Sequence, residues 1–436
     1  MTTATEQIRK DMDAIEGVLK QFGITPGTVY RDKPCRVTPE NGGLIYSSTG
    51  NFVEFVISTP DKHAKVHGLE NELNQALTFS RDRRPTYVTF TEPILGVRFP
   101  HPSPETLEWD MVPSHLEPYQ YVVGRDYTAQ RPVPMVMSLE DGPTPHLLIT
   151  GTTGAGKSVI TANAICTLVT HTAPQQLALL VIAIKPDRDP DMKLLNGLPH
   201  MIRSIVTDAQ EGMTWLRKVM ALKEWRMKHG WDGKIRLVVN IQELSELGGT
   251  VDDKTEMLAI LASILQVGRS LGIHVLADTQ YPTVDVVGKQ GKANFPAMVV
   301  AMLANQQVNA TVCGGWGIEA HKLPGRGACY VLKGGKVFYC QSHNLQNEML
   351  RAIVSQANVL YPNPTTLVLP EVGQDDYTGE NDLEKVLALY TVDELVQDGK
   401  LVNGAIAKAG RAIYGEEFDS GGAGFYRVKK ILGGLK

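Results

Sequence analysis

HLLITGTTGAGKSVITANAICTLV, residues 146–169, fixes the fold class of this chain. A short apolar run comes first, a glycine-rich loop follows, and the remainder has the spacing of a helix. The loop, GTTGAGKS, matches G-x-x-x-x-G-K-[ST], in which glycines let several backbone N–H groups point at phosphate oxygens. The dipole at the start of the helix also favours negative charge. A chance glycine-rich turn would not need both flanking elements, so we predict a nucleotide-phosphate site.

The loop residues are expected to divide the work of binding. Lys157 should reach the β- and γ-phosphates, and the Ser158 hydroxyl should bind Mg²⁺. The implied cofactors are therefore ATP and Mg²⁺. The predicted ATP-binding residues are Gly151, Thr152, Thr153, Gly154, Ala155, Gly156, Lys157 and Ser158.

Short apolar runs recur on both sides of this loop. They are PHLLIT, LALLVIAI, IRLVVNI, GIHVLADT and AMVVAML, and helical segments separate them. Near-continuous apolar strands that alternate with helices are typical of a parallel sheet covered on both faces. The later stretch GACYVLKGGKVFYCQS predicts a hairpin that turns at Gly334-Gly335. The core is therefore predicted to be α/β.

Four parts of the chain follow from changes in pattern. The first is a helix with a single apolar face, and the second alternates strands and helices before a proline-rich linker. The last part shows three helical segments with turn glycines. The predicted parts are 1–27, an N-terminal helix; 28–120, a small α/β domain plus linker; 121–370, the ATPase core; and 381–436, a winged-helix-like helical domain.

The second half of the site is predicted at RLVVNIQELSEL, residues 236–247, where a buried strand runs toward a helix. Glu243 is placed to polarise the attacking water. Gln242 occupies the metal-side position but carries no charge, so we expect slow turnover; the alternative is that this strand only fills the sheet core. Gln280 ends the next strand, where it either contacts the γ-phosphate and its water or is an ordinary strand-end amide.

Bulk composition excludes several classes of protein. The 436 residues carry a formal net charge of −4, with 43% hydrophobic and 21% charged residues, which is ordinary globular usage. The five cysteines show no CxxC spacing, which favours reduced thiols. The polar N-terminus is unlike a signal peptide, and no apolar run reaches the ~20 residues of a membrane helix. We therefore expect a cytoplasmic protein.

Taken together, these segments resemble the FtsK/SpoIIIE family of DNA-pumping motors, within the FtsK–HerA group of RecA-like P-loop ATPases. The resemblance covers roughly residues 28–360. It implies an ATPase that assembles as a homo-oligomeric ring, a hexamer, around double-stranded DNA. Arg269 falls where the family places an arginine that reaches the neighbour's γ-phosphate, although an exposed helix-end arginine is the plain alternative. The segments that carry the resemblance are TPHLLITGTTGAGKSVITANAI, NGLPHMIRSIVTDAQEGMTWLRKVMALKEWRMK, GRSLGIHVLADTQYPTVDVVGKQGKANFP and GRGACYVLKGGKVFYCQ.

Three departures from the family pattern stand out. A basic residue that the family has after the Lys-Ala-Asn-x-Pro strand aligns near Gln306. Gln242 occupies the position of the family's Walker B aspartate, as a natural variant or as an engineered change that traps a nucleotide-loaded state. The chain also has no membrane segment and no long proline- and glutamine-rich linker. This favours a freestanding motor, such as a relative from a phage, a plasmid or a mobile element, or a deliberately truncated form of a longer motor.

Candidate DNA contacts lie in two regions. Arg188, Lys289 and Lys292 follow core strands at the nucleotide edge, where cations would grip phosphates without reading sequence. Arg427 and Lys430 lie in the last predicted helix, which resembles the recognition helix of a winged helix-turn-helix. Solvated loop charges and a helical packing cap are the respective alternatives.

The sequence thus predicts an ATP-driven double-stranded DNA translocase. A conjugative or packaging motor would use the same chemistry. A secretion-type ATPase that moves protein, and a nucleotide-binding scaffold without motor activity, are the alternatives from other classes.

Overall fold

The protein's structure, a computed structural model, describes most of the chain. None of the helices in the described ranges is both long enough and apolar enough to cross a membrane. The described residues are 4–24, 45–49, 52–56, 63–81, 88–91, 96–100, 107–109, 112–127, 133–184, 191–231, 233–250, 254–283, 286, 295–370, 390–397, 400–402 and 404–414.

The central domain is built on a nine-stranded sheet whose order is β6-β5-β13-β12-β11-β7-β10-β9-β8. The five strands from β11 to β8 run parallel, as the apolar runs predicted. Strand β10 lies between β7 and β9, so it separates the phosphate loop from the strand that ends in Gln242. This confirms a RecA-like α/β core. The five strands are β7 (Leu147–Thr150), β8 (Leu177–Ala183), β9 (Arg236–Gln242), β10 (Ile273–Thr279) and β11 (Ala297–Ala301).

Four antiparallel strands extend the sheet beyond β11. Strands β12 (Ala328–Lys333) and β13 (Lys336–Gln341) form the predicted hairpin. Gly334 and Gly335 both have positive φ, 56° and 73°, which is the backbone of a type I′ turn. Strands β5 (Gln120–Asp126) and β6 (Val133–Ser138) complete the edge, and sequence patterning did not predict their pairing.

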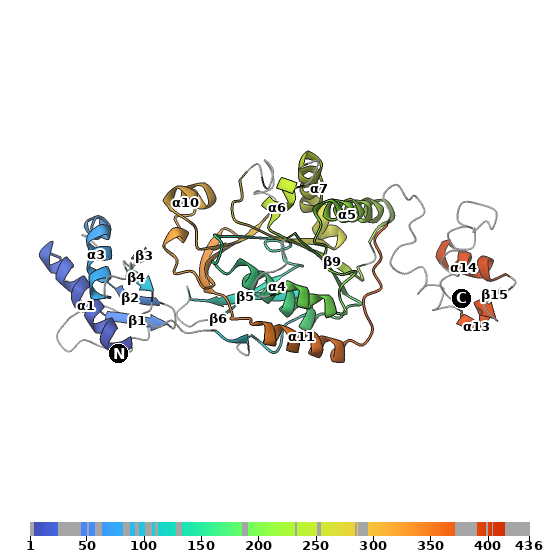
Figure 1. Cartoon of the computed structure of the whole chain (residues 1–436), viewed down its shortest axis with the longest axis horizontal. Coiled ribbons are helices and arrows are strands. Elements are labelled where there is room, and N and C mark those ends of the chain that lie inside the picture. Colours follow the sequence, from blue (N-terminus) through green and yellow to red (C-terminus); the bar gives the residue numbers. More distant parts are fainter. Residues whose placement is uncertain are drawn as a thin grey trace.

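Helices cover both faces of this sheet (Figure 1). On one face lie α4 (Lys157–His171) and α11 (Asn347–Leu360). On the other lie α5 (Ala209–His229) and α7 (Lys254–Val267). Successive strand residues alternate between these two cores, as the pleat requires. The shorter described helices of this domain are η3 (Met192–Gly197), α6 (Leu244–Thr250), η4 (Gly268–Leu271), α10 (Gln306–Cys313) and η5 (Ala320–Lys322).

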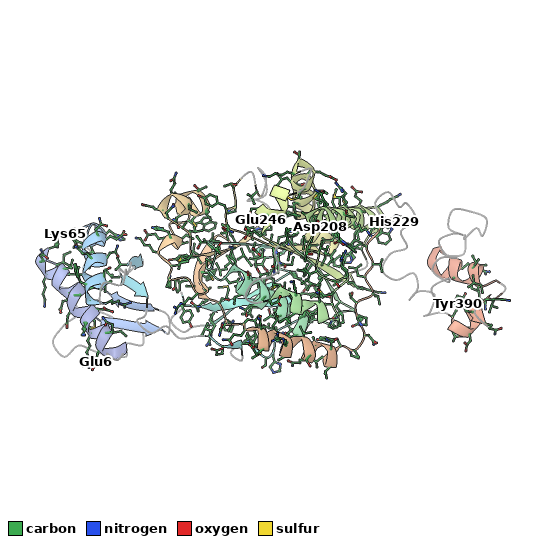
Figure 2. The ribbon with its side chains drawn as sticks, viewed as in Figure 1. Glu6, Lys65, Asp208, His229, Glu246 and Tyr390 are labelled. Carbon is green, nitrogen blue, oxygen red and sulfur yellow. The ribbon has the colours of Figure 1, made fainter. Side chains whose placement is uncertain are left out.

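The ends of α5 illustrate how local sequence sets helix limits. The Asp208 side chain accepts a hydrogen bond from the Glu211 N–H, which caps the first turn. Basic residues gather in the last turn, where they favour the helix dipole. Gly230 follows with φ 80°, which ends the helix. Figure 2 marks the two ends at Asp208 and His229.

The first hundred residues form a smaller α/β unit around a four-stranded antiparallel sheet ordered β1-β2-β4-β3. Its first helix packs on the third through one shared apolar core. The buried Asp11 carboxylate accepts hydrogen bonds from Arg81 at 2.6 and 2.9 Å and ties the two helices together. The elements are α1 (Ala4–Gln21), β1 (Ile45–Thr49), β2 (Phe52–Val56), α2 (His63–His67), α3 (Glu70–Ser80), β3 (Thr89–Thr91) and β4 (Gly96–Pro100).

Part of the predicted linker packs against the central domain. Leu107 is 1% exposed and belongs to the core beneath α5 and α7. Its carbonyl accepts a hydrogen bond from the Asn344 N–H at 2.5 Å. The proline-rich composition therefore marked irregular backbone here, but the described end of this segment is fixed to the sheet domain.

The described part of the tail differs from the predicted helices. The first predicted helical segment, DLEKVLALYTVDELVQDG (382–399), is described only near its end, as α13 (Val392–Leu395) and then β14 (Val396–Gln397). β14 pairs with β15 (Lys400–Leu401), so a helix through residue 397 was wrong. The second predicted helix is found as α14 (Ala405–Tyr414). The third predicted helix lies outside the described residues.

Candidate nucleotide-binding site

The phosphate loop joins β7 to α4 through glycines that the backbone requires. Gly156 has φ 100° and immediately precedes the first helical residue, Lys157. A Cβ at Gly156 would come within 3.0 Å of the Gly327 N atom, so a side chain has no room. Gly151 has φ 157°, and a Cβ there would meet the Ala301 side chain at 2.9 Å. The loop is thus packed against the ends of β11 and β12.

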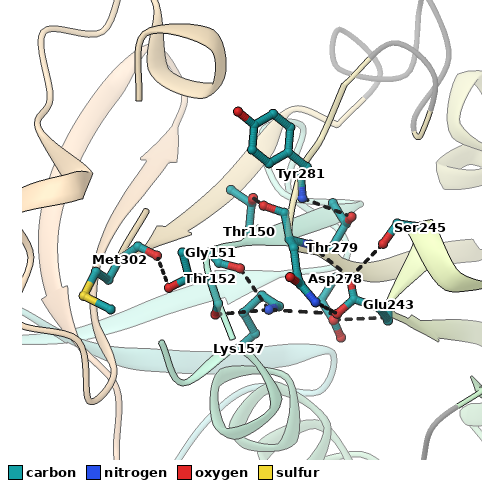
Figure 3. A network of polar contacts seen from close by, with 11 residues as sticks. Thr150, Gly151, Thr152, Lys157, Glu243, Ser245, Asp278, Thr279, Tyr281 and Met302 are labelled. Carbon is teal, nitrogen blue, oxygen red and sulfur yellow. Dashed lines mark hydrogen bonds and ion pairs between the residues drawn. The ribbon is translucent and has the colours of Figure 1, made fainter. Parts of the chain in front are cut away.

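Hydrogen bonds hold the loop in place (Figure 3). The Thr152 N–H and Oγ1 both donate to the Met302 carbonyl, at 2.8 and 3.1 Å. Lys157 Nζ donates to the carbonyls of Gly151 and Thr152, at 2.9 and 3.3 Å. Thr153 and Gly154 are exposed at the tip of the loop, and Ser158 is half-buried as the second residue of α4.

Glu243 faces this loop from the end of β9. Its backbone has φ 52°, a left-handed conformation that is uncommon for a residue with a side chain. The side chain is nearly fully buried, and its Oε2 lies 4.0 Å from Lys157 Nζ. Ser245 Oγ and the Gln280 N–H donate to Oε1 at 2.9 and 3.0 Å. Gln280 Nε2 approaches Oε2 at 3.4 Å. The structure therefore brings Lys157, Glu243 and Gln280 together, as Figure 3 shows for the first two.

These contacts keep the Glu243 carboxyl ionised. Burial acts to raise its pKa, since a charge is disfavoured away from water. The hydrogen bond from Ser245 and the Lys157 ammonium oppose this, and the hydrogen bonds from Gln280 add to them. The net result is a pKa below the ordinary value for glutamate. A carboxylate that stays charged near a phosphate loop can polarise a water or accept its proton.

Gln242 lies one residue before Glu243, and Asp278 lies two residues before Gln280. Gln242 is 4% exposed, and its Nε2 is buried with no hydrogen-bond partner among the described residues. Asp278 is 1% exposed and its Oδ1 accepts the Glu243 N–H at 3.1 Å. Sequence reasoning did not single out Asp278 or Ser245. The available signal for Asp278 was an acid inside the otherwise apolar strand HVLADT.

Arg269 lies at the amino ends of the parallel strands, opposite to the carboxyl ends where the phosphate loop lies. It is exposed in η4, just before the amino end of β10, and its guanidinium donates to the Glu140 carbonyl at 2.8 Å. Lys157 follows the carboxyl end of the parallel strand β7. The seven residues of β10 separate the two ends, about 23 Å at ~3.3 Å per residue. Arg269 therefore cannot reach the phosphate loop of its own chain.

The candidate DNA contacts lie outside the described residues. This holds for Arg188, Lys289 and Lys292 in the loops and for Arg427 and Lys430 in the tail. Their roles stay predictions.

Comparison with known proteins points to one family of motors. Residues 113–229 match the FtsK/SpoIIIE family. "DNA translocase FtsK" of Campylobacter jejuni subsp. jejuni is 26% identical over 317 residues, which cover 66% of this chain and 32% of the relative. The protein of the same name from Staphylococcus epidermidis is 26% identical over 360 residues, covering 75% and 41%. The chain thus spans about a third of the length of the first of these relatives and 41% of the second.

Solved structures with similarity to this chain include a conjugation coupling protein and a secretion ATPase. The monomer form of the pCW3 conjugation coupling protein TcpA with ATPγS gives a TM-score of 0.49 at 17% identity, over 80% of this chain and 99% of that one. The cytoplasmic domain of the Thermomonospora curvata type VII secretion ATPase EccC gives 0.46 at 18% identity, over 59% and 33%.

Proposed function

We propose that this chain hydrolyses ATP to move along double-stranded DNA as a homo-oligomeric ring, because residues 113–229 match the FtsK/SpoIIIE family and two translocases of that family are similar to it. One observation carries the ATPase part of the proposal. A buried, ionised Glu243 carboxylate lies 4.0 Å from the phosphate-loop Lys157. The strands that precede these two residues, β9 and β7, are separated only by β10. The relatives named above are DNA translocases, and this supports DNA as the track.

Each side chain of the site has a task in this proposal. Lys157 would exchange its loop carbonyls for the β- and γ-phosphate oxygens. Glu243 would orient the attacking water and accept its proton, because its carboxylate is anchored from two sides. Gln280 bonds to Glu243 through its N–H, so it would couple the end of β10 to the reacting centre.

The residues present also fit Mg²⁺, a hard cation that prefers oxygen ligands. The Ser158 hydroxyl stands at the start of α4, beside the loop. The buried Gln242 amide ends β9, and the buried Asp278 carboxylate lies one residue before the end of β10. Mg²⁺ bound there would neutralise charge on the β- and γ-phosphates.

Arg269 supports assembly as a condition for turnover. Its distance from the phosphate loop of its own chain leaves action on a neighbouring subunit as its only catalytic role. Arginine fingers supplied by a neighbour are worth ~10³–10⁵ in rate in other nucleotide hydrolases. A ring places every Arg269 next to a neighbour's site, and we propose six subunits.

DNA would be held by cations in the loops at the nucleotide edge and by the tail. Lys289 and Lys292 would grip backbone phosphates, and Arg188 would add to them. The tail, with Arg427 and Lys430, would act as a winged-helix reader of DNA sequence. The hairpin β14–β15 and helix α14 are compatible with such a module.

The test is steady-state ATPase activity with and without linear duplex DNA, together with the mass of the assembly. We expect a hexamer whose turnover rises at least tenfold with DNA, and we expect Lys157→Ala to abolish it. Absence of turnover under all conditions would refute the ATPase assignment. Turnover that ignores duplex DNA would refute the DNA track and would favour a protein-moving ATPase.

A further inference from the structure

Asp278 occupies a place in the sheet that bears directly on the missing charge at Gln242. In the parallel pairing of β10 with β9, Ala277 lies opposite Ile241. Continuing this register by one residue sets Asp278 beside Gln242, about 4.8 Å away across the strands. In the pairing with β7, Asp278 lies opposite Ile149, two residues before Gly151. Asp278 is thus one strand closer to the phosphate loop than Gln242.

Both side chains point to the face of the sheet that α4 covers. Leu276 and Ile149 belong to the core under α4, whereas Ala277 and Leu148 belong to the core on the other face. Since side chains alternate along a strand, Asp278 shares the α4 face with Leu276. Ala183, the register partner of Gln242 on β8, belongs to the same core.

The Asp278 carboxylate is fixed in this position. Its Oδ1 accepts the N–H of Glu243, the residue in the left-handed conformation. A carboxylate offers about four lone-pair sites, so it can accept from more than one partner at once. Figure 3 shows Asp278 beside Glu243, with Lys157 approaching from the phosphate loop.

Gln242 supplies a second, independent observation. Its Nε2 is buried on the same face, and within the part of the chain that the structure describes it has no hydrogen-bond partner. A buried donor left unsatisfied costs free energy, and a catalytic role or a bound water or ion is among the explanations for such a group. An amide N–H can donate to a phosphate oxygen but cannot ligate a metal cation. The polar pair therefore combines one donor with one carboxylate.

We propose that Asp278 holds Mg²⁺, directly or through a metal-bound water, and that Gln242 donates to a phosphate oxygen. The carboxylate expected at the end of β9 is provided instead by Asp278 on the adjacent strand β10, which is closer to the phosphate loop. This assignment rests on the proposed binding of Mg²⁺–ATP. It also removes the reason to expect slow turnover, because the site keeps its carboxylate.

A purely structural role for Asp278 makes a different prediction. If its only task were to accept the Glu243 N–H, Asn would replace it with little effect, since the Asn Oδ1 accepts the same bond. A metal-holding role requires the charge. Asp278→Asn therefore separates the two roles with almost no change in shape.

The experiment measures binding of a fluorescent, non-hydrolysable ATP analogue to the full chain in EDTA and across a range of free Mg²⁺. We expect Asp278→Asn to raise the half-saturating Mg²⁺ concentration at least tenfold, while affinity in EDTA stays within twofold. Adding Gln242→Asp to that variant should restore the Mg²⁺ requirement to within threefold of the unsubstituted chain. Gln242→Asp alone should weaken binding in EDTA, because a carboxylate replaces the phosphate donor, but it should lower the half-saturating Mg²⁺ concentration less than threefold. This variant does not depend on the folding of Asp278→Asn.

Two results would overturn the assignment. One is an unchanged Mg²⁺ requirement in folded Asp278→Asn. The other is a tenfold gain in Mg²⁺ affinity from Gln242→Asp alone, which would mean that the site lacked a carboxylate. Failure of the unsubstituted chain to bind the analogue with or without Mg²⁺ is a different outcome: it would overturn the proposed function, and this assignment with it.

Discussion

Replacing Glu243 by Gln isolates the charge that the proposed hydrolysis depends on. The amide keeps an oxygen that can accept from Ser245 Oγ and the Gln280 N–H, so the position of the side chain should be preserved. What is lost is the negative charge 4.0 Å from Lys157. General base catalysis contributes ~10²–10⁴ in rate. We therefore expect DNA-stimulated turnover to fall by that factor, about 2.7–5.4 kcal/mol of barrier.

Binding of ATP should respond in the opposite direction. At 4.0 Å an ion pair is worth about 4 kcal/mol by Coulomb's law at an effective dielectric constant of ~20, before the cost of desolvation. Glu243 competes with phosphate for the Lys157 ammonium, so its loss should leave nucleotide affinity unchanged or tighter. The assays are steady-state turnover at saturating duplex DNA and equilibrium binding of a non-hydrolysable ATP analogue.

A matched control is Ser245→Ala, which removes one hydrogen bond to the carboxylate and keeps its charge. We expect this variant to lose tenfold or less in turnover, in line with a net hydrogen-bond contribution of about 0.5–1.5 kcal/mol. Turnover by Glu243→Gln within threefold of the unsubstituted chain would refute the reasoning, and the general base would have to lie elsewhere.

Three other predictions follow from the structure. Arg269→Ala subunits alone and Lys157→Ala subunits alone should not hydrolyse ATP. A mixture of the two should recover measurable activity, because one type of interface in a mixed ring keeps both Arg269 and Lys157. An inactive mixture that still forms rings would argue against action in trans. Arg226→Met should lower the free energy of unfolding, measured in urea, by about 3 kcal/mol or more, since the buried guanidinium donates to three backbone carbonyls. The control is Arg217→Ala, at a half-exposed side chain, which should lower the free energy of unfolding by less than ~1 kcal/mol. Burial lowers the pKa of His146 to about 4 in the folded chain, so as pH falls below ~6.5 the histidine is protonated in the unfolded chain but stays neutral in the folded one. This difference should lower the free energy of unfolding by about 2 kcal/mol at pH 5. His146→Asn should therefore reduce the difference between the urea midpoints measured at pH 7 and pH 5.

The parallel core could be predicted from sequence because its signals are local and redundant. Each strand is a nearly continuous apolar run, and the phosphate loop links one of them to a helix through glycines that nothing else can replace. The turn at Gly334 and Gly335 could also be predicted from sequence, because two consecutive glycines suit the positive φ values of a type I′ hairpin. These features depend on neighbours in the chain.

What could not be predicted depends on residues distant in sequence. Asp278 becomes notable only once β10 is known to lie between β7 and β9, since strand order decides which side chains share a face. The position of Arg269 at the far edge likewise follows from strand direction. In the tail, Val396–Gln397 continued a helical pattern, but pairing with β15 outweighed local propensity.

Translocation along duplex DNA is the central claim, and displacement of a third strand from a DNA triplex measures it most directly. With ATP and Mg²⁺, the unsubstituted chain should release the third strand from a duplex that carries a long flanking arm, at a rate that rises with ATP. Lys157→Ala should release none. Hydrolysis of ATP on the same DNA without any release of the third strand would contradict the account.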